Sequence, residues 1–154
     1  HNQCVTSLWA LLTGVVNLSR NFAYERPQGE IMFDLDDQEM QITCNLDTLR
    51  HALAEIVSNA LDFSSSDQPV VISQIKQDDN LVITIRNYGT LTEAQTIKNI
   101  LHNRPTKRDT AKSKGLGLGL TLAQHIITLH NGSLQLDETF TDGTTLVVHL
   151  PLNA

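Results

Sequence analysis

The chain has 154 residues, enough for one domain with a real hydrophobic core, alone or with an appendage. Its formal net charge of −6 disfavours a nucleic-acid backbone as the main partner, because such binding rests on neutralising phosphates. Polar residues interrupt the apolar segment 5–18, which therefore predicts neither a transmembrane helix nor a secretory leader. We expect a soluble domain that contacts neither nucleic acid nor a membrane.

The two cysteines, Cys4 and Cys44, lie in unlike sequence contexts and lack the spacing of a metal site. This usage is typical of buried, structural cysteines in a reducing cytoplasm. The six histidines are scattered without a ligand pattern, which is typical of surface or core residues. We assign no chemistry to either cysteine.

The first part of the chain predicts one helix, two strands and a second helix. Apolar residues at helical spacing predict a helix within residues 5–24 that needs a partner helix, from this chain or another, to cover its stripe. Alternating apolar residues at 31–35 and 40–44 predict two strands that form a hairpin. Asn45 or Asp47 can cap the helix that follows.

This second helix should extend to about Phe63 and carries a polar stripe beside its apolar one. Glu55, Asn59 and Asp62 are spaced i, i+4 and i+7, so their side chains should point toward a common region. On a helix considered alone, a solvated face is the more common explanation of such a stripe.

Further strands and a short helix complete the predicted fold. The strands are expected at residues 70–76, 81–86, 134–136 and 144–150, and the short helix from Thr92 to about Leu101. Asn131-Gly132 predicts the end of the helix that starts after Gly119. Because the strands come in hairpin-like pairs separated by helices, we expect an α/β (α+β) two-layer sandwich. Its mixed, mainly antiparallel sheet would be covered on one face by helices.

Gly115, Gly117 and Gly119 alternate with leucines and lead into an apolar, helix-spaced segment. The run predicts a turn at a helix start, where free N–H groups and the helix macrodipole favour a bound phosphate. Considered alone, the run is equally consistent with simple packing between a loop and a helix. Basic residues lie just before it, and we interpret them as a basic lid rather than a solvated loop: Arg104, Lys107, Arg108, Lys112 and Lys114.

Segments in a fixed order resemble the boxes of one ATPase superfamily. They are residues 55–63 for the N box, Asn87-Tyr88-Gly89 for a reduced first glycine box, Gly115–Leu120 for the second glycine box and residues 143–151 for the closing strand. Together they resemble the ATP-binding (Bergerat) fold of histidine kinases, gyrase, Hsp90 and MutL, and specifically the catalytic domain of a sensor histidine kinase. The resemblance covers roughly residues 30–152.

The resemblance implies ATP and Mg²⁺ as cofactors. Asn59 stands where the family holds the metal through an amide oxygen, and Glu55 matches the carboxylate that polarises the attacking nucleophile. The implied nucleotide-binding residues are Asn59, Asn87, Gly89, Lys107, Arg108, Lys114, Gly115, Gly117, Leu118, Gly119 and Thr144.

The sequence departs from the family pattern at three positions. Asn87 replaces the aspartate that accepts a hydrogen bond from the adenine amino group; its amide oxygen still accepts, but without charge. Leu91 replaces the second glycine of that box, and Asp62 stands where many kinases carry a lysine near the phosphates. A weaker or altered nucleotide site is therefore left open.

The implied function is that of the ATP-binding domain of a two-component sensor histidine kinase, cytoplasmic or tethered to a membrane. Residues 28–154 would form that domain, and residues 1–27 the tail of a dimerisation and phosphotransfer hairpin. The γ-phosphoryl group would pass to a histidine outside this sequence, and then to the receiver domain of a response regulator. Two alternatives remain: a non-catalytic docking module, favoured by Asn87 and Leu91, and a serine kinase of the anti-sigma type.

Overall fold

The computed structural model describes residues 3–65, 67–89, 94–102 and 116–152. The helices are α1 (Leu8–Phe22), α2 (Leu46–Phe63), α3 (Ala94–Leu101) and α4 (Leu116–Leu129). The strands are β1 (Gln3–Ser7), β2 (Ile31–Leu35), β3 (Gln41–Asn45), β4 (Val70–Gln77), β5 (Asn80–Tyr88), β6 (Ser133–Leu136) and β7 (Gly143–Pro151). No helix in the described ranges is long and apolar enough to cross a bilayer.

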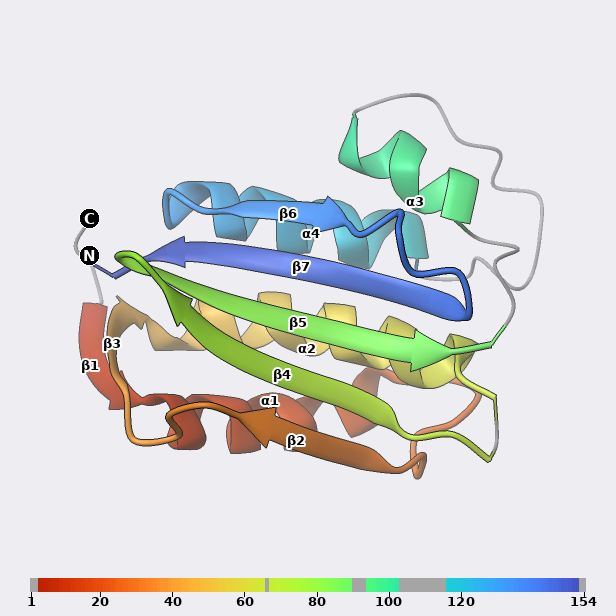
Figure 1. Cartoon of the computed structure of the whole chain (residues 1–154), viewed down its shortest axis with the longest axis horizontal. Coiled ribbons are helices and arrows are strands. Elements are labelled where there is room, and N and C mark those ends of the chain that lie inside the picture. Colours follow the sequence, from red (N-terminus) through yellow and green to blue (C-terminus); the bar gives the residue numbers. More distant parts are fainter. Residues whose placement is uncertain (1–2, 66, 90–93, 103–115, 153–154) are drawn as a thin grey trace.

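The main sheet has five strands in the order β2-β4-β5-β7-β6. β2 runs parallel to β4, and every other pair in this sheet is antiparallel. Figure 1 shows α1, α2 and α4 together behind this sheet. The predicted fold, a mixed and mainly antiparallel sheet with helices on one face, is therefore confirmed.

The predicted hairpin of segments 31–35 and 40–44 is wrong. β2 lies at the edge of the main sheet beside β4, whereas β3 pairs antiparallel with β1 in a separate two-stranded sheet. Residues 3–7 form β1, so the first helix starts at Leu8 and not at residue 5. Alternation of apolar residues marks each strand but carries no information about its partner.

The partner helix that α1 requires belongs to the same chain. The buried side chains of α1 join a continuous core with those of α2, and the two helices pack against each other. The α1 residues in this core are Leu8, Leu11, Leu12 and Val15. Most of the predicted apolar stripe is thus covered within this chain, although Trp9 stays 40% exposed. The division of the chain at residue 27 stays a prediction.

Capping contacts fix the start of α2. The Asn45 side chain accepts a hydrogen bond from the Thr48 N–H at 3.3 Å, which confirms Asn45 and not Asp47 as the cap. Asp47 lies in the first turn, where the macrodipole favours a carboxylate. The Asn45 N–H itself donates to Nε2 of His130 at 3.2 Å, which ties the start of α2 to the end of α4.

The fourth helix begins earlier than predicted. Leu116 is already helical, so the turn expected over Gly115–Leu120 is wrong from that residue onward. The end of the helix is as predicted: Asn131 takes a left-handed φ of 63°, and the Gly132 N–H donates to the Ile127 carbonyl at 2.9 Å.

We predict that Leu11→Ala lowers the free energy of unfolding by about 2–5 kcal/mol, because Leu11 is fully buried and the truncation leaves a cavity. Urea unfolding of the whole chain measures this. Leu129→Ala is the matched control: that side chain is 68% exposed, and its loss should change stability by less than about 0.5 kcal/mol. Equal effects of the two changes would contradict an integral role for α1.

Candidate active site

Glu55 lies where α4 packs against the middle of α2. The backbone of Gly119, near the start of α4, approaches Glu55 so closely that a Cβ at position 119 would collide with the carboxylate. Only glycine fits there without displacing Glu55. The structure thus brings two residues of the predicted site into contact, and it gives Gly119 a packing role that the sequence did not reveal.

The environment of Glu55 makes its carboxylate a stronger proton acceptor. Burial raises the pKa of Glu55 above its ordinary value, because desolvation disfavours the charged form. His51, one helical turn earlier on α2, lowers the pKa in part.

Asn59 follows Glu55 by one helical turn. Its side-chain Nδ2 atom is buried and has no hydrogen-bond partner among the described residues. Buried polar groups are nearly always paired, so an unpaired amide beside a half-buried carboxylate is characteristic of a site that a ligand completes.

Asn87 lies near the end of β5 and is 3% exposed. Its Nδ2 donates to the Phe63 carbonyl at 3.3 Å. A carbonyl only accepts, so the amide nitrogen must face Phe63, and the side-chain oxygen is left to accept a hydrogen bond elsewhere. Thr144 of β7 lies directly opposite Asn87 in the β5–β7 ladder and is also buried.

Gly89 holds the end of β5 against the end of α2. Its φ is 153°, and a Cβ at this position would lie 2.7 Å from the Phe63 carbonyl oxygen. Its N–H donates to the Asp142 carbonyl at 3.1 Å. A substitution here would therefore disturb the same carbonyl that orients Asn87.

Asp62 does not join the common region predicted for Glu55 and Asn59. Its carboxylate accepts three backbone N–H groups, from Tyr24 at 3.0 Å, Glu25 at 2.7 Å and Arg26 at 3.2 Å. Asp62 thus anchors the segment after α1 to the last turn of α2. These partners are remote in sequence, and no local pattern indicates them.

Part of the predicted site lies outside the described residues: Lys107, Arg108, Lys114 and Gly115. Gly117 and Leu118 lie in the first turn of α4, where only the helical backbone is described.

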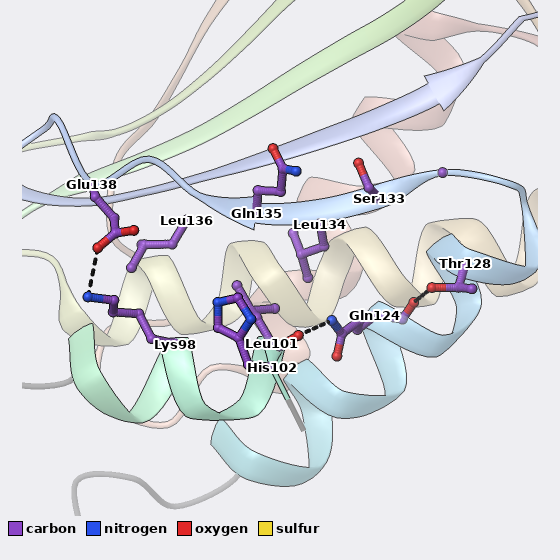
Figure 2. Close-up of a pocket in the computed structure, with 11 residues that line it drawn as sticks. Lys98, Leu101, His102, Gln124, Thr128, Ser133, Leu134, Gln135, Leu136 and Glu138 are labelled. Atoms are coloured by element: carbon purple, nitrogen blue, oxygen red, sulfur yellow. Dashed lines mark hydrogen bonds and ion pairs between the residues drawn. The ribbon is translucent and has the colours of Figure 1, made fainter. Parts of the chain in front are cut away.

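A separate groove of about 430 Å³ lies between α3, α4 and β6 (Figure 2), and none of its lining residues belongs to the predicted site. An ion pair of 2.7 Å joins Lys98 Nζ on α3 to Glu138 Oε1 after β6, and Gln124 on α4 donates to the Leu101 carbonyl at 2.9 Å. These contacts hold α3 in place. The sequence did not predict the groove, because its residues come from distant segments with no shared motif.

Comparison with known proteins agrees with this geometry. The family described as histidine kinase-, DNA gyrase B-, and HSP90-like ATPase matches residues 44–154. Heme sensor protein HssS of Staphylococcus haemolyticus is 27% identical over 128 residues, or 77% of this chain and 28% of that protein. Sensor histidine kinase WalK of Bacillus subtilis is 27% identical over 126 residues, or 79% of this chain and 21% of that protein. The chain thus spans about a quarter of the length of these relatives.

Solved structures share the fold at lower identity. The catalytic domain of histidine kinase ThkA superposes with a TM-score of 0.75 at 16% identity, over 99% of this chain and 97% of that one. This match includes β1 and α1, in keeping with the burial of α1 side chains in the same core. With the family match over most of its length, the chain belongs to the family of histidine kinase-, DNA gyrase B- and HSP90-like ATPases.

Proposed function

We propose that this chain is the ATP-binding catalytic domain of a two-component sensor histidine kinase. It would transfer the γ-phosphoryl group of ATP to a histidine outside this sequence, for relay to the receiver domain of a response regulator. Membership of an ATPase family and the names of the relatives support this proposal. The observation that carries it is the buried Nδ2 atom of Asn59, one turn from Glu55, which has no hydrogen-bond partner in the described part of the chain. A cytoplasmic location stays a prediction.

The residues at this site fit Mg²⁺ together with a nucleotide. An amide oxygen is a suitable ligand for Mg²⁺, which otherwise takes phosphate oxygens and water. If the Asn59 side-chain oxygen bound the metal, the side-chain nitrogen could donate a hydrogen bond to a phosphate oxygen. This would give Nδ2 the partner that it lacks among the described residues. The ion, when bound, supplies neutralisation of phosphate charge.

Each remaining role follows from one side chain. Glu55, whose pKa is raised by burial, would accept or orient the proton of the attacking imidazole. Asn87, oriented by the Phe63 carbonyl, would accept a hydrogen bond from the adenine amino group through its amide oxygen. The basic residues Lys107, Arg108 and Lys114 would neutralise phosphate charge, as proposed from the sequence.

We predict that Asn59→Ala weakens binding of a non-hydrolysable ATP analogue with Mg²⁺ by about 10-fold to 100-fold, because one contact to a charged group is lost. Isothermal titration calorimetry measures this. The free energy of unfolding should not fall, since Nδ2 has no hydrogen-bond partner among the described residues to lose. Asn17→Ala, on the exposed face of α1, is the control. Unchanged affinity in the Asn59 variant would refute the metal and phosphate assignment.

We predict that Asn87→Asp does not improve binding, although aspartate is the usual residue of the family. The carboxylate cannot donate to the Phe63 carbonyl and would repel it, so the unfolding free energy should drop by about 1–3 kcal/mol. Nucleotide titration and urea unfolding report the two effects. Asn21→Asp, exposed on α1, is the matched control. Tighter binding without loss of stability would contradict the orientation assigned to Asn87.

We predict that Glu55→Gln lowers phosphoryl transfer about 10²-fold to 10⁴-fold while nucleotide binding persists, because only the proton acceptor is lost. The assay supplies labelled ATP and a separate histidine-bearing helical hairpin from a related kinase. Glu39→Gln, at an exposed carboxylate in the β2–β3 connection, is the control. No transfer by the unaltered chain, despite nucleotide binding, would argue against the kinase assignment.

The same variant should also change the pH dependence of stability. The folded-state pKa of Glu55 is raised by burial, so its favourable contribution is complete at acid pH and lost as pH rises through that pKa. Glu55→Gln should therefore be more stable than the unaltered chain at neutral pH. The gap should shrink when urea unfolding is repeated at acid pH.

A further inference from the structure

The two cysteines of the chain face each other across the small sheet. Cys4 of β1 and Cys44 of β3 are directly opposite residues in the antiparallel β1–β3 ladder. Opposite residues of an antiparallel pair direct their side chains to the same face. Both thiols are free.

The spacing of such a pair suits a covalent bond. Opposite Cα atoms in an antiparallel ladder lie about 4.5–5.5 Å apart, within the range of about 4.4–6.8 Å found for disulfides. Burial raises the pKa of Cys44, and the neighbouring Cys4 raises it further, so each thiol lies within electrostatic reach of the other.

The two thiols differ in their access to solvent. Cys44 is only 1% exposed and belongs to the core, as expected, but the burial expected for Cys4 is wrong, because Cys4 is exposed. An oxidant in solution therefore reaches Cys4 first, because the Cys44 side chain is almost wholly shielded from solvent. Such a difference suits a pair in which the exposed thiol reacts with the oxidant and the buried thiol then forms the disulfide with it.

We propose that Cys4 and Cys44 form a reversible intrachain disulfide, with a hydroperoxide as the oxidant. The Cys4 thiolate attacks the O–O bond of hydrogen peroxide, which gives a Cys4 sulfenic acid and hydroxide. The Cys44 sulfur then attacks the Cys4 sulfur, and the hydroxyl group leaves with the Cys44 proton as water. Overall, two thiols and one peroxide yield one disulfide and two waters, and a dithiol reverses the bond by exchange.

The disulfide would join the two strands that lead into the main helices. β1 runs directly into α1, and β3 runs into α2 through the capping residue Asn45. The bond therefore fixes the starts of α1 and α2 relative to each other and closes a long loop between them. This inference does not depend on the proposed kinase activity.

The test treats the reduced 154-residue chain with hydrogen peroxide, removes the oxidant, unfolds the chain in urea and then labels the remaining thiols with a maleimide, so that Cys44 is also accessible. We expect a monomer that has lost two hydrogen atoms by intact mass and takes up no label. The midpoint of thermal unfolding should rise by about 10 °C and return with dithiothreitol. Cys4→Ser removes the partner at an exposed position, so this variant should gain neither the mass change nor the thermal shift.

The double variant Cys4→Ser/Val5→Cys is the matched control. It keeps two thiols but moves one by a single position, opposite Thr43 and onto the other face of the strand. We expect no intrachain disulfide in this variant. Full maleimide labelling of the oxidised unaltered chain, a disulfide only between molecules, or an equal yield from the double variant would each overturn the proposal.

Discussion

The burial of one helix, α2, fixes the geometry on which the rest of the molecule depends. It packs against α1 and α4 and against β5 of the main sheet. Leu49, Leu53, Ile56 and Val57 are all fully buried on it, so the helix cannot rotate without exposing apolar side chains to water. Because the orientation of α2 about its axis is fixed, Glu55 faces the start of α4, and Asn59 lies one helical turn after Glu55. The hydrophobic contacts of α2 therefore set the positions of its polar groups.

The end of α2 gathers two of the three departures from the family pattern, Asp62 and Asn87; the third, Leu91, lies outside the described residues. Asn87 donates to the Phe63 carbonyl, and Asp62 accepts the amides of residues 24–26, so each unusual side chain has a backbone partner. An aspartate at position 87 would have no N–H to donate to the Phe63 carbonyl, and a lysine at position 62 would have no oxygen to accept the backbone N–H groups of residues 24–26. Both side chains thus fit the local structure of this chain. The linker after α1 is connected through Asp62 and Phe63 to the adenine side of the proposed site.

The sequence predicted those features that depend on neighbouring residues. A cap at Asn45 or Asp47, the extent of α2, the helix end at Asn131 and the short β4–β5 connection all follow from local chemistry, and the structure selects Asn45 as the cap. It did not predict which strands pair: β2 joins β4, and β3 joins β1, through contacts between distant segments. For the same reason, the partners of Asp62, the closeness of Gly119 to Glu55 and the meeting of Cys4 with Cys44 required the structure.

The parallel pairing of β2 with β4 has a consequence for the order of folding. Ile31 aligns with Val70, and the whole of α2 lies between them in the chain. Contacts within α2 and within the β4–β5 hairpin close only short loops of chain. The β2–β4 ladder must close a long loop, and the entropic cost of closing it comes before the strand hydrogen bonds and packing contacts can form. We expect β2 to join the sheet late during refolding, after α2 has docked. Pulsed hydrogen exchange would reveal this as slow protection of β2 amides relative to those of β5.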